Sequence, residues 1–152
     1  MFDLIVTGGT AVMPEAAEPA DIGVAGDKIV AVGAPGSLAQ IGASRTVDAA
    51  GQIVIPGGID PHIHCLMPMQ FQPDTPPFLS AGPEQVSRAA LFGGTTTVLD
   101  FAPCRPEMPL QQSIENRLAE FAGACHCDYG FHLMLWGTQT PTIFDKLWAR
   151  EI

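Results

Sequence analysis

The chain has 152 residues, with 7 Lys and Arg residues against 16 Asp and Glu residues, which gives a formal net charge of −9. This acidic balance argues against a nucleic acid or an anionic membrane as partner, because both require a basic face. Hydrophobic residues make up 47% of the chain, enough for a buried core, yet no apolar run approaches the roughly 18 residues of a membrane helix. The N-terminus has no basic segment ahead of an apolar one, so we expect a cytoplasmic protein without a secretory signal.

Residues 1–55 have the pattern of short strands joined by glycine turns. The candidate strands are Phe2–Val6, Asp21–Ala25, Lys28–Val32, Thr46–Asp48 and Gln52–Ile55. Gly26-Asp27 predicts a two-residue hairpin, and Ala50-Gly51 predicts a second turn. The acidic, proline-bearing segment Glu15–Pro19 predicts a surface loop. We therefore expect residues 1–55 to form part of a small β-sandwich.

From residue 56 onward, strands alternate with helices. The strand candidates are Ile59–His64, Thr95–Asp100 and Tyr129–Leu135. The helix candidates run from Pro83 to Gly93, along the apolar stripe Leu110, Ile114, Leu118, Phe121 and Cys125, and from Pro141 to Trp148. Pro68–Ser80 predicts a long loop. This order is typical of parallel βα units. Residues 56–152 hold about three, whereas a closed eight-unit barrel needs about 250 residues, so we expect a truncated α/β barrel.

The segment from Val54 to His64 carries the strongest chemical signal, because it contains a His-x-His pair. Residues two apart in an extended backbone point to the same side. His62 and His64 can therefore present two imidazoles to one metal ion, and neutral imidazole suits zinc and similar divalent ions. The end of a barrel strand is also where such sites are built. Two surface histidines that occur together by chance are the alternative.

Other polar residues leave more than one interpretation open. His132 lies in an apolar strand and favours a hydrogen-bonded core histidine over a site residue, and His126 is expected at the surface. Asp60 could orient the histidine segment or cap a local turn. Asp100 could lie at the mouth of the site or form a turn. Cys125-His126-Cys127 favours reduced thiols over a soft-metal site.

Four blocks together resemble the cyclic amidohydrolases, specifically the dihydropyrimidinase/hydantoinase family. The blocks are Pro56–His64, Met67-Pro68, Gly93–Phe101 and Asp128–His132. The resemblance implies a distorted (β/α)8 barrel of the TIM type beside a β-sandwich assembled from both chain termini. Residues 1–55 would then belong to the sandwich and residues 56–152 to the first part of the barrel.

The resemblance also implies a chemistry. Two divalent metals, usually zinc, share a bridging hydroxide and a carboxylated lysine, and His62 and His64 bind the more buried metal. The hydroxide opens a cyclic amide such as dihydrouracil or a hydantoin to an N-carbamoyl amino acid. Met67 and Met69 lie in a loop that borders the substrate's exocyclic substituent, although ordinary loop packing would also explain them. Family members are usually homotetramers.

The rest of the family's metal site is not found in this sequence. Lys28 and Lys146 are the only lysines, and neither stands where the bridging lysine is expected. The resemblance places that lysine and the catalytic aspartate beyond Ile152, so it implies an N-terminal portion that is inactive by itself. The alternatives are a noncatalytic scaffold or interaction protein on the same fold, and a relative of dihydroorotase or allantoinase.

Overall fold

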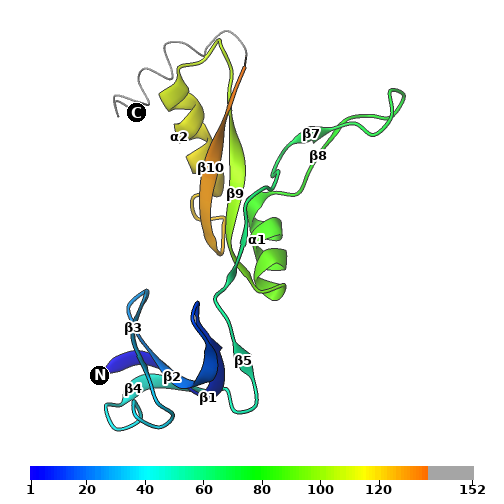
Figure 1. Cartoon of the computed structure of the whole chain (residues 1–152). Helices are drawn as coiled ribbons and strands as arrows, with labels where there is room; N and C mark the ends of the chain where they lie inside the picture. The colour runs from blue at the N-terminus through cyan, green and yellow to red at the C-terminus, as the bar shows by residue number, and fades with distance from the viewer. Residues whose placement is uncertain (137–152) are drawn as a thin grey trace. The chain divides into compact units, whose positions relative to one another are not determined.

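The computed structural model describes residues 1–136, and the chain divides into two compact units. The first unit is Met1–Pro56, and the second begins at Gly57 (Figure 1). The helix expected from Pro141 to Trp148 falls outside the described residues. Among the described helices, none has the length and apolar character needed to cross a membrane.

The first unit is a five-stranded sheet built around its first strand. Its strands are β1 (Phe2–Val12), β2 (Ala17–Ala25), β3 (Lys28–Gly33), β4 (Ala43–Asp48) and β5 (Ile53–Val54). The order is β3-β2-β1-β4, and β5 also pairs with β1. Pairing is antiparallel between β1 and β2 and between β2 and β3, and parallel between β1 and both β4 and β5.

Local turn chemistry predicts much of this sheet. The hairpin is confirmed, because Ala25 pairs with Lys28 and Gly26 takes a φ of +59° that favours glycine. The turn before β5 is also confirmed, by a bond from the Gln52 N–H to the Ala49 carbonyl. The surface loop at Glu15–Pro19 is wrong in part, since its last three residues belong to β2. Proline is accommodated there because pairing of β2 with β3 begins only at Asp21.

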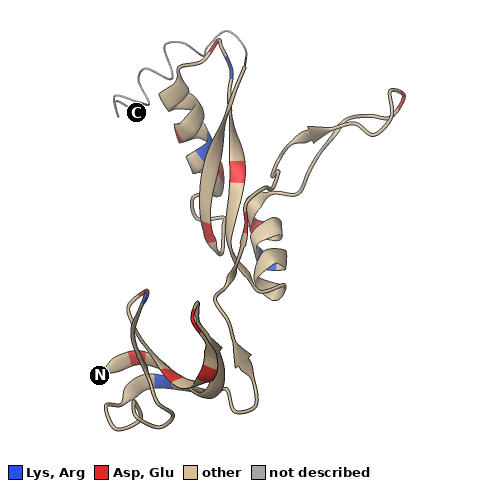
Figure 2. Cartoon of the chain, in the orientation of Figure 1, with Lys and Arg blue, Asp and Glu red and all other residues tan. Residues whose placement is uncertain are grey.

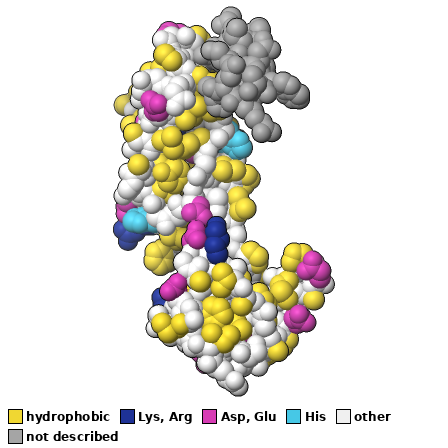
Figure 3. All heavy atoms as spheres, turned by 90° about the vertical axis from the view of Figure 1, so that its left-hand side faces the viewer, with side chains coloured by type: hydrophobic (Ala, Val, Ile, Leu, Met, Phe, Trp, Pro, Cys, Tyr) yellow, Lys and Arg dark blue, Asp and Glu magenta, His cyan; other side chains and the backbone are white. Residues whose placement is uncertain are grey.

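One face of this sheet is apolar and open. A groove of about 360 Å³ on this face is lined by apolar residues of β1, β2, β3 and β5 and of the segments that follow β1 and β5. The exposed fraction reaches 66% for Ile29 and 67% for Ile55. Hydrophobic side chains are seen at the surface of both units in Figure 3. A sheet normally buries such a face against a second layer.

The second unit is a mixed α/β unit whose core element is a three-stranded parallel sheet. Its elements are β6 (Gly58–Asp60), β7 (Pro68–Met69), β8 (Phe78–Leu79), α1 (Pro83–Phe92), β9 (Thr95–Cys104), α2 (Leu110–Phe121) and β10 (Asp128–Leu135). The sheet order is β10-β9-β6, with both pairings parallel. Both helices pack against the central strand β9. The parallel βα arrangement is therefore confirmed for the described elements.

Several boundaries differ from the sequence-based expectation. The strand expected at Ile59–His64 ends at Asp60, because Pro61 has no N–H to continue the ladder. The strand expected at Thr95–Asp100 continues to Cys104, because residues 101–104 also pair with β10. The long loop at Pro68–Ser80 contains the short antiparallel pair β7–β8.

Helix α2 buries only part of the apolar stripe that the sequence predicts. Phe121 of the stripe is buried and Leu110 and Ile114 are half-buried, but Leu118 is 42% exposed, and the other fully buried residues are Ser113 and Arg117. Cys125 lies beyond the helix. The reason for the burial of Arg117 is an ion pair between β9 and α2. Figure 2 shows it as an acidic band in the middle of β9 and a basic band on α2.

Candidate metal centre

The two histidines of the His-x-His pair converge just beyond the carboxyl end of β6. His62 is exposed and His64 is half-buried. Their Nε2 atoms lie 3.1 Å apart, and the rings meet edge to face with centroids 4.9 Å apart. The pair follows a strand of a parallel sheet at the end where such folds place their ligands. The structure therefore brings together the two residues that the sequence predicts as metal ligands.

The spacing of the pair fits shared coordination of one ion. Two imidazole nitrogens bound to a tetrahedral zinc ion at about 2.05 Å each stand about 3.3 Å apart. The observed 3.1 Å between the Nε2 atoms is close to that value. Two imidazoles cannot complete such a site, and among residues 1–136 no group of three or more His, Cys, Asp or Glu side chains is arranged to hold a metal.

Phe101 forms the floor beneath the histidines. Its ring centroid lies 4.7 Å from that of His62 and 4.9 Å from that of His64. On the neighbouring strand, His132 pairs in register with Phe101, and the two ring centroids lie 5.0 Å apart. His132 Nε2 lies 2.9 Å from the Pro61 carbonyl, so its hydrogen bond is confirmed. The expectation of a core position is wrong, because His132 is exposed in the described chain.

Short polar contacts hold the backbone around the pair. The Asp60 carboxylate accepts the His62 N–H at 3.1 Å, a local Asx-type bond that also fixes the start of the histidine segment. The Ile63 N–H donates to the Leu99 carbonyl at 2.9 Å. Thus one residue of the segment is tied to β9 and another to the preceding carboxylate.

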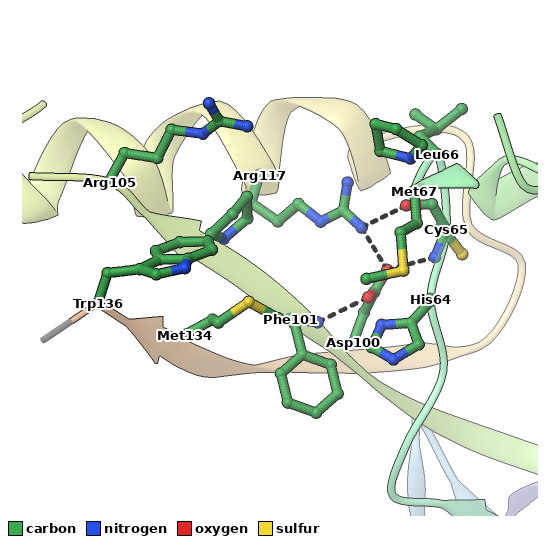
Figure 4. A pocket seen from close by; sticks show the side chains of 12 residues that line it. His64, Cys65, Leu66, Met67, Asp100, Phe101, Arg105, Arg117, Met134 and Trp136 are labelled. Carbon is green, nitrogen blue, oxygen red and sulfur yellow. Dashed lines mark hydrogen bonds and ion pairs between the residues drawn. The ribbon is translucent and has the colours of Figure 1, made fainter. Parts of the chain in front are cut away.

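Asp100 and Arg117 form a buried ion pair near His64 (Figure 4). Strand alternation places Asp100 opposite to Phe101, against α2, where only 1% of its side chain is exposed. Arg117 Nη2 lies 2.6 Å from Asp100 Oδ2 and 2.7 Å from the Cys65 carbonyl. Asp100 Oδ2 also accepts the Cys65 N–H at 3.1 Å. Asp100 is therefore not a turn residue, and Arg117 was not anticipated from the sequence at all.

A pocket of about 240 Å³ opens beside His64. Met67 lines it, together with the aromatic rings of Phe101 and Trp136. Met69 is not among its lining residues and instead pairs with Phe78 in the β7–β8 hairpin. Of the two methionines predicted to border a substrate, the structure brings one to the pocket beside the histidine pair.

The cysteines differ in environment from the histidines. Burial, aided by the neighbouring Asp100 carboxylate, raises the pKa of Cys65 to about 12, so this thiol stays protonated. Cys125 and Cys127 are half-buried free thiols with sulfur atoms 3.9 Å apart. His126 lies at the surface, as predicted, with its Nε2 3.6 Å from Glu84.

Comparison with known proteins identifies the family of the chain. The sequence profile of the amidohydrolase family matches residues 53–137, more than half of the chain. A D-hydantoinase of Geobacillus stearothermophilus is 37% identical over 131 residues, 86% of this chain and 26% of the relative. An allantoinase of Rubrobacter xylanophilus is 35% identical over 92% of this chain and 28% of the relative.

A solved structure has the same fold. The crystal structure of dihydropyrimidinase from Brevibacillus agri NCHU1002 superposes with a TM-score of 0.78 at 31% identity, over 94% of this chain and 29% of that one. The chain thus spans between a quarter and a third of the length of these relatives. By its profile match, its similarity to hydantoinases and the position of its histidine pair, the chain belongs to the amidohydrolase family.

Proposed function

We propose that the chain supplies two metal ligands, His62 and His64, to an enzyme that hydrolyses a cyclic amide. The observation that carries the proposal is the convergence of the two Nε2 atoms, 3.1 Å apart, beyond the end of a parallel strand. The similarity to a D-hydantoinase and a dihydropyrimidinase supports hydantoins and dihydropyrimidines as the substrate class. Ring opening would then give an N-carbamoyl amino acid.

Each residue has a role that follows from its position. A bound divalent metal would supply Lewis acidity that polarises a carbonyl and lowers the pKa of water, and an imidazole pair suits zinc. His62 and His64 would hold that metal, Phe101 would keep the floor beneath them apolar, and Met67 would form an adaptable wall for a ring substituent. Met69 would act only indirectly, through the β7–β8 hairpin.

Further sequence would complete both units. Residues 1–55 would be part of a composite β-sandwich, which the open apolar face of their sheet supports, and residues 56–152 would be the first part of a barrel. A bridging carboxylated lysine, a second metal and the catalytic aspartate would come from further sequence, in a homotetramer. Residues 1–152 alone would then be inactive, since their described part gathers only two imidazoles.

The test is hydrolysis by a protein that carries this chain together with the remaining barrel. We expect ring opening of dihydrouracil and 5-substituted hydantoins, and its loss together with one bound metal in His62→Ala. The matched control is His126→Ala, which removes an exposed histidine outside the pair. Full metal content and activity in His62→Ala would refute the proposal.

An allantoinase is the second candidate, because an allantoinase is 35% identical over most of this chain. Allantoin and dihydroorotate are therefore included beside the first two substrates, and preference for allantoin would favour this candidate. A noncatalytic scaffold would open none of the four rings and would bind no metal at His62 and His64.

A further inference from the structure

We propose that Asp100 and Arg117 are positioning residues, which fix the histidine pair by holding the backbone of the residue that follows it. The relevance of this role to metal binding rests on the proposed function. The structural part of the inference does not, because it concerns the arrangement of the imidazoles in the chain itself.

The ion pair forms hydrogen bonds with both backbone polar groups of Cys65. The Cys65 N–H donates to Asp100 Oδ2 at 3.1 Å, and the Cys65 carbonyl accepts from Arg117 Nη2 at 2.7 Å. Since Asp100 and Arg117 are themselves joined at 2.6 Å, the three residues form a closed ring of contacts. Cys65 is covalently adjacent to His64, so the position of this peptide sets where the His64 side chain begins.

The segment after Cys65 also needs such support. Leu66 has a φ of +50°, in the left-handed region that a branched aliphatic residue adopts only when its surroundings impose it. Its N–H donates to the Ala81 carbonyl at 3.1 Å. Ser80 Oγ donates to the His64 carbonyl at 2.7 Å and accepts the Met67 N–H at 2.9 Å. The turn from His64 to Met67 is thus held from two sides, by Ser80 and by the ion pair.

The burial of the ion pair suits a role in holding the backbone better than a role as exposed surface charges. The side chains are 9% exposed for Arg117 and 1% exposed for Asp100, so neither charge is satisfied by bulk water. The guanidinium also pairs with Glu120, and its Cζ lies over the Phe121 ring, 5.2 Å from the ring centroid. A lysine at this position would supply a point charge without the planar fork that serves several acceptors in fixed directions.

The experiment uses the 152-residue chain and four variants. Arg117→Lys keeps the charge and removes the fork, whereas Asp100→Asn keeps the size and removes the charge. The double variant Asp100→Leu with Arg117→Met replaces both charges by apolar groups, so that neither is left buried alone. Arg88→Met is the control, since it breaks the exposed pair between Arg88 and Glu84 on α1.

Three quantities are measured for each variant. They are the hydrogen exchange of the Cys65 and Met67 amides, the NMR contact between the rings of His62 and His64 without metal, and the affinity for Zn²⁺ by calorimetry. We expect faster exchange, loss of the ring contact and a roughly 10–100-fold weaker affinity in Arg117→Lys and Asp100→Asn. The double variant should regain thermal stability but none of these three properties, whereas Arg88→Met should match the wild type.

The ring contact decides the inference. If it persists in the single variants, or if the double variant restores it along with stability, the pair acts only on stability and the inference is overturned. If His62→Ala keeps its metal and its activity in the protein that carries the remaining barrel, while the ring contact still responds to Asp100→Asn, the proposed function fails and the positioning role stands.

Discussion

Gly57, the residue before β6, lies close to Thr96 of β9, and this contact makes a demanding test of the fold beneath the histidines. A Cβ added at Gly57 would lie 2.7 Å from Thr96 Cβ and closer still to both branches of that side chain, whereas real Cβ atoms essentially never come within 3.0 Å. No rotamer of Thr96 relieves the clash, because its own Cβ is involved. In Gly57→Ala, β6 must therefore move away from β9.

The expected cost of that shift is about 1–3 kcal/mol, the range for overpacking a filled site. With a urea m value of about 2 kcal/mol/M, a loss of 2 kcal/mol lowers the unfolding midpoint by about 1 M. Trp136 lies in the second unit, so its fluorescence during urea unfolding follows the unit that contains Gly57.

A double-mutant cycle separates the clash from other effects. Thr96→Gly removes the three atoms that lie nearest to the new Cβ, so Gly57→Ala should cost much less stability in that background than in the wild type. Gly82→Ala is the control, because the nearest atom to its Cβ would be Leu66 Cδ2 at an ordinary 3.5 Å. Wild-type stability in Gly57→Ala, or the absence of coupling with Thr96→Gly, would refute the close packing of β6 on β9.

Two further predictions concern titrating groups. The Thr7 hydroxyl donates to the buried Asp21 carboxylate at 2.7 Å and lowers the pKa of Asp21 below 3.8. The stability that this hydrogen bond contributes is therefore present above pH 3.8 and is lost as the pH falls through the lowered pKa. In Thr7→Val we expect about 1.5–3 kcal/mol less unfolding free energy at pH 7 and a smaller deficit at pH 2–3, measured by circular dichroism; a deficit independent of pH would contradict this origin. Burial raises the pKa of Cys127 to about 11, so its alkylation by iodoacetamide at pH 8 should be on the order of 100-fold slower than that of an ordinary thiol with a pKa of about 8.5 and should accelerate up to about pH 11; a rate that levels off near pH 9 would contradict it.

Local chemistry made parts of the fold predictable. Gly26-Asp27 specifies a hairpin by itself, and Pro83 with Gly93 brackets α1 by the residues that begin and end helices. The extent of β9 was not predictable in this way. Its last four residues, 101–104, are held by pairing with β10, a partner more than twenty residues away in sequence.

The candidate site was likewise predictable only in part. The convergence of His62 and His64 follows from two-residue spacing after a strand, although the strand itself ends at Asp60. The ion pair near His64 was not predicted, because the apolar stripe of α2 indicates Leu118 rather than Arg117 as a buried residue. A signal existed: an aspartate inside an otherwise apolar strand requires a buried partner, and Ser113, Arg117 and Phe121 recur every four residues.

The central claim is that His62 and His64 bind one divalent metal together. Titration of the 152-residue chain with Zn²⁺, followed by ¹H–¹⁵N spectra of the imidazole side chains, tests it directly. We predict that both imidazoles shift in parallel with one ion per chain, that either single alanine variant abolishes the shift of the remaining histidine, and that His126→Ala changes nothing. Independent shifts of the two histidines, or a response of His64 that survives His62→Ala, would contradict the claim.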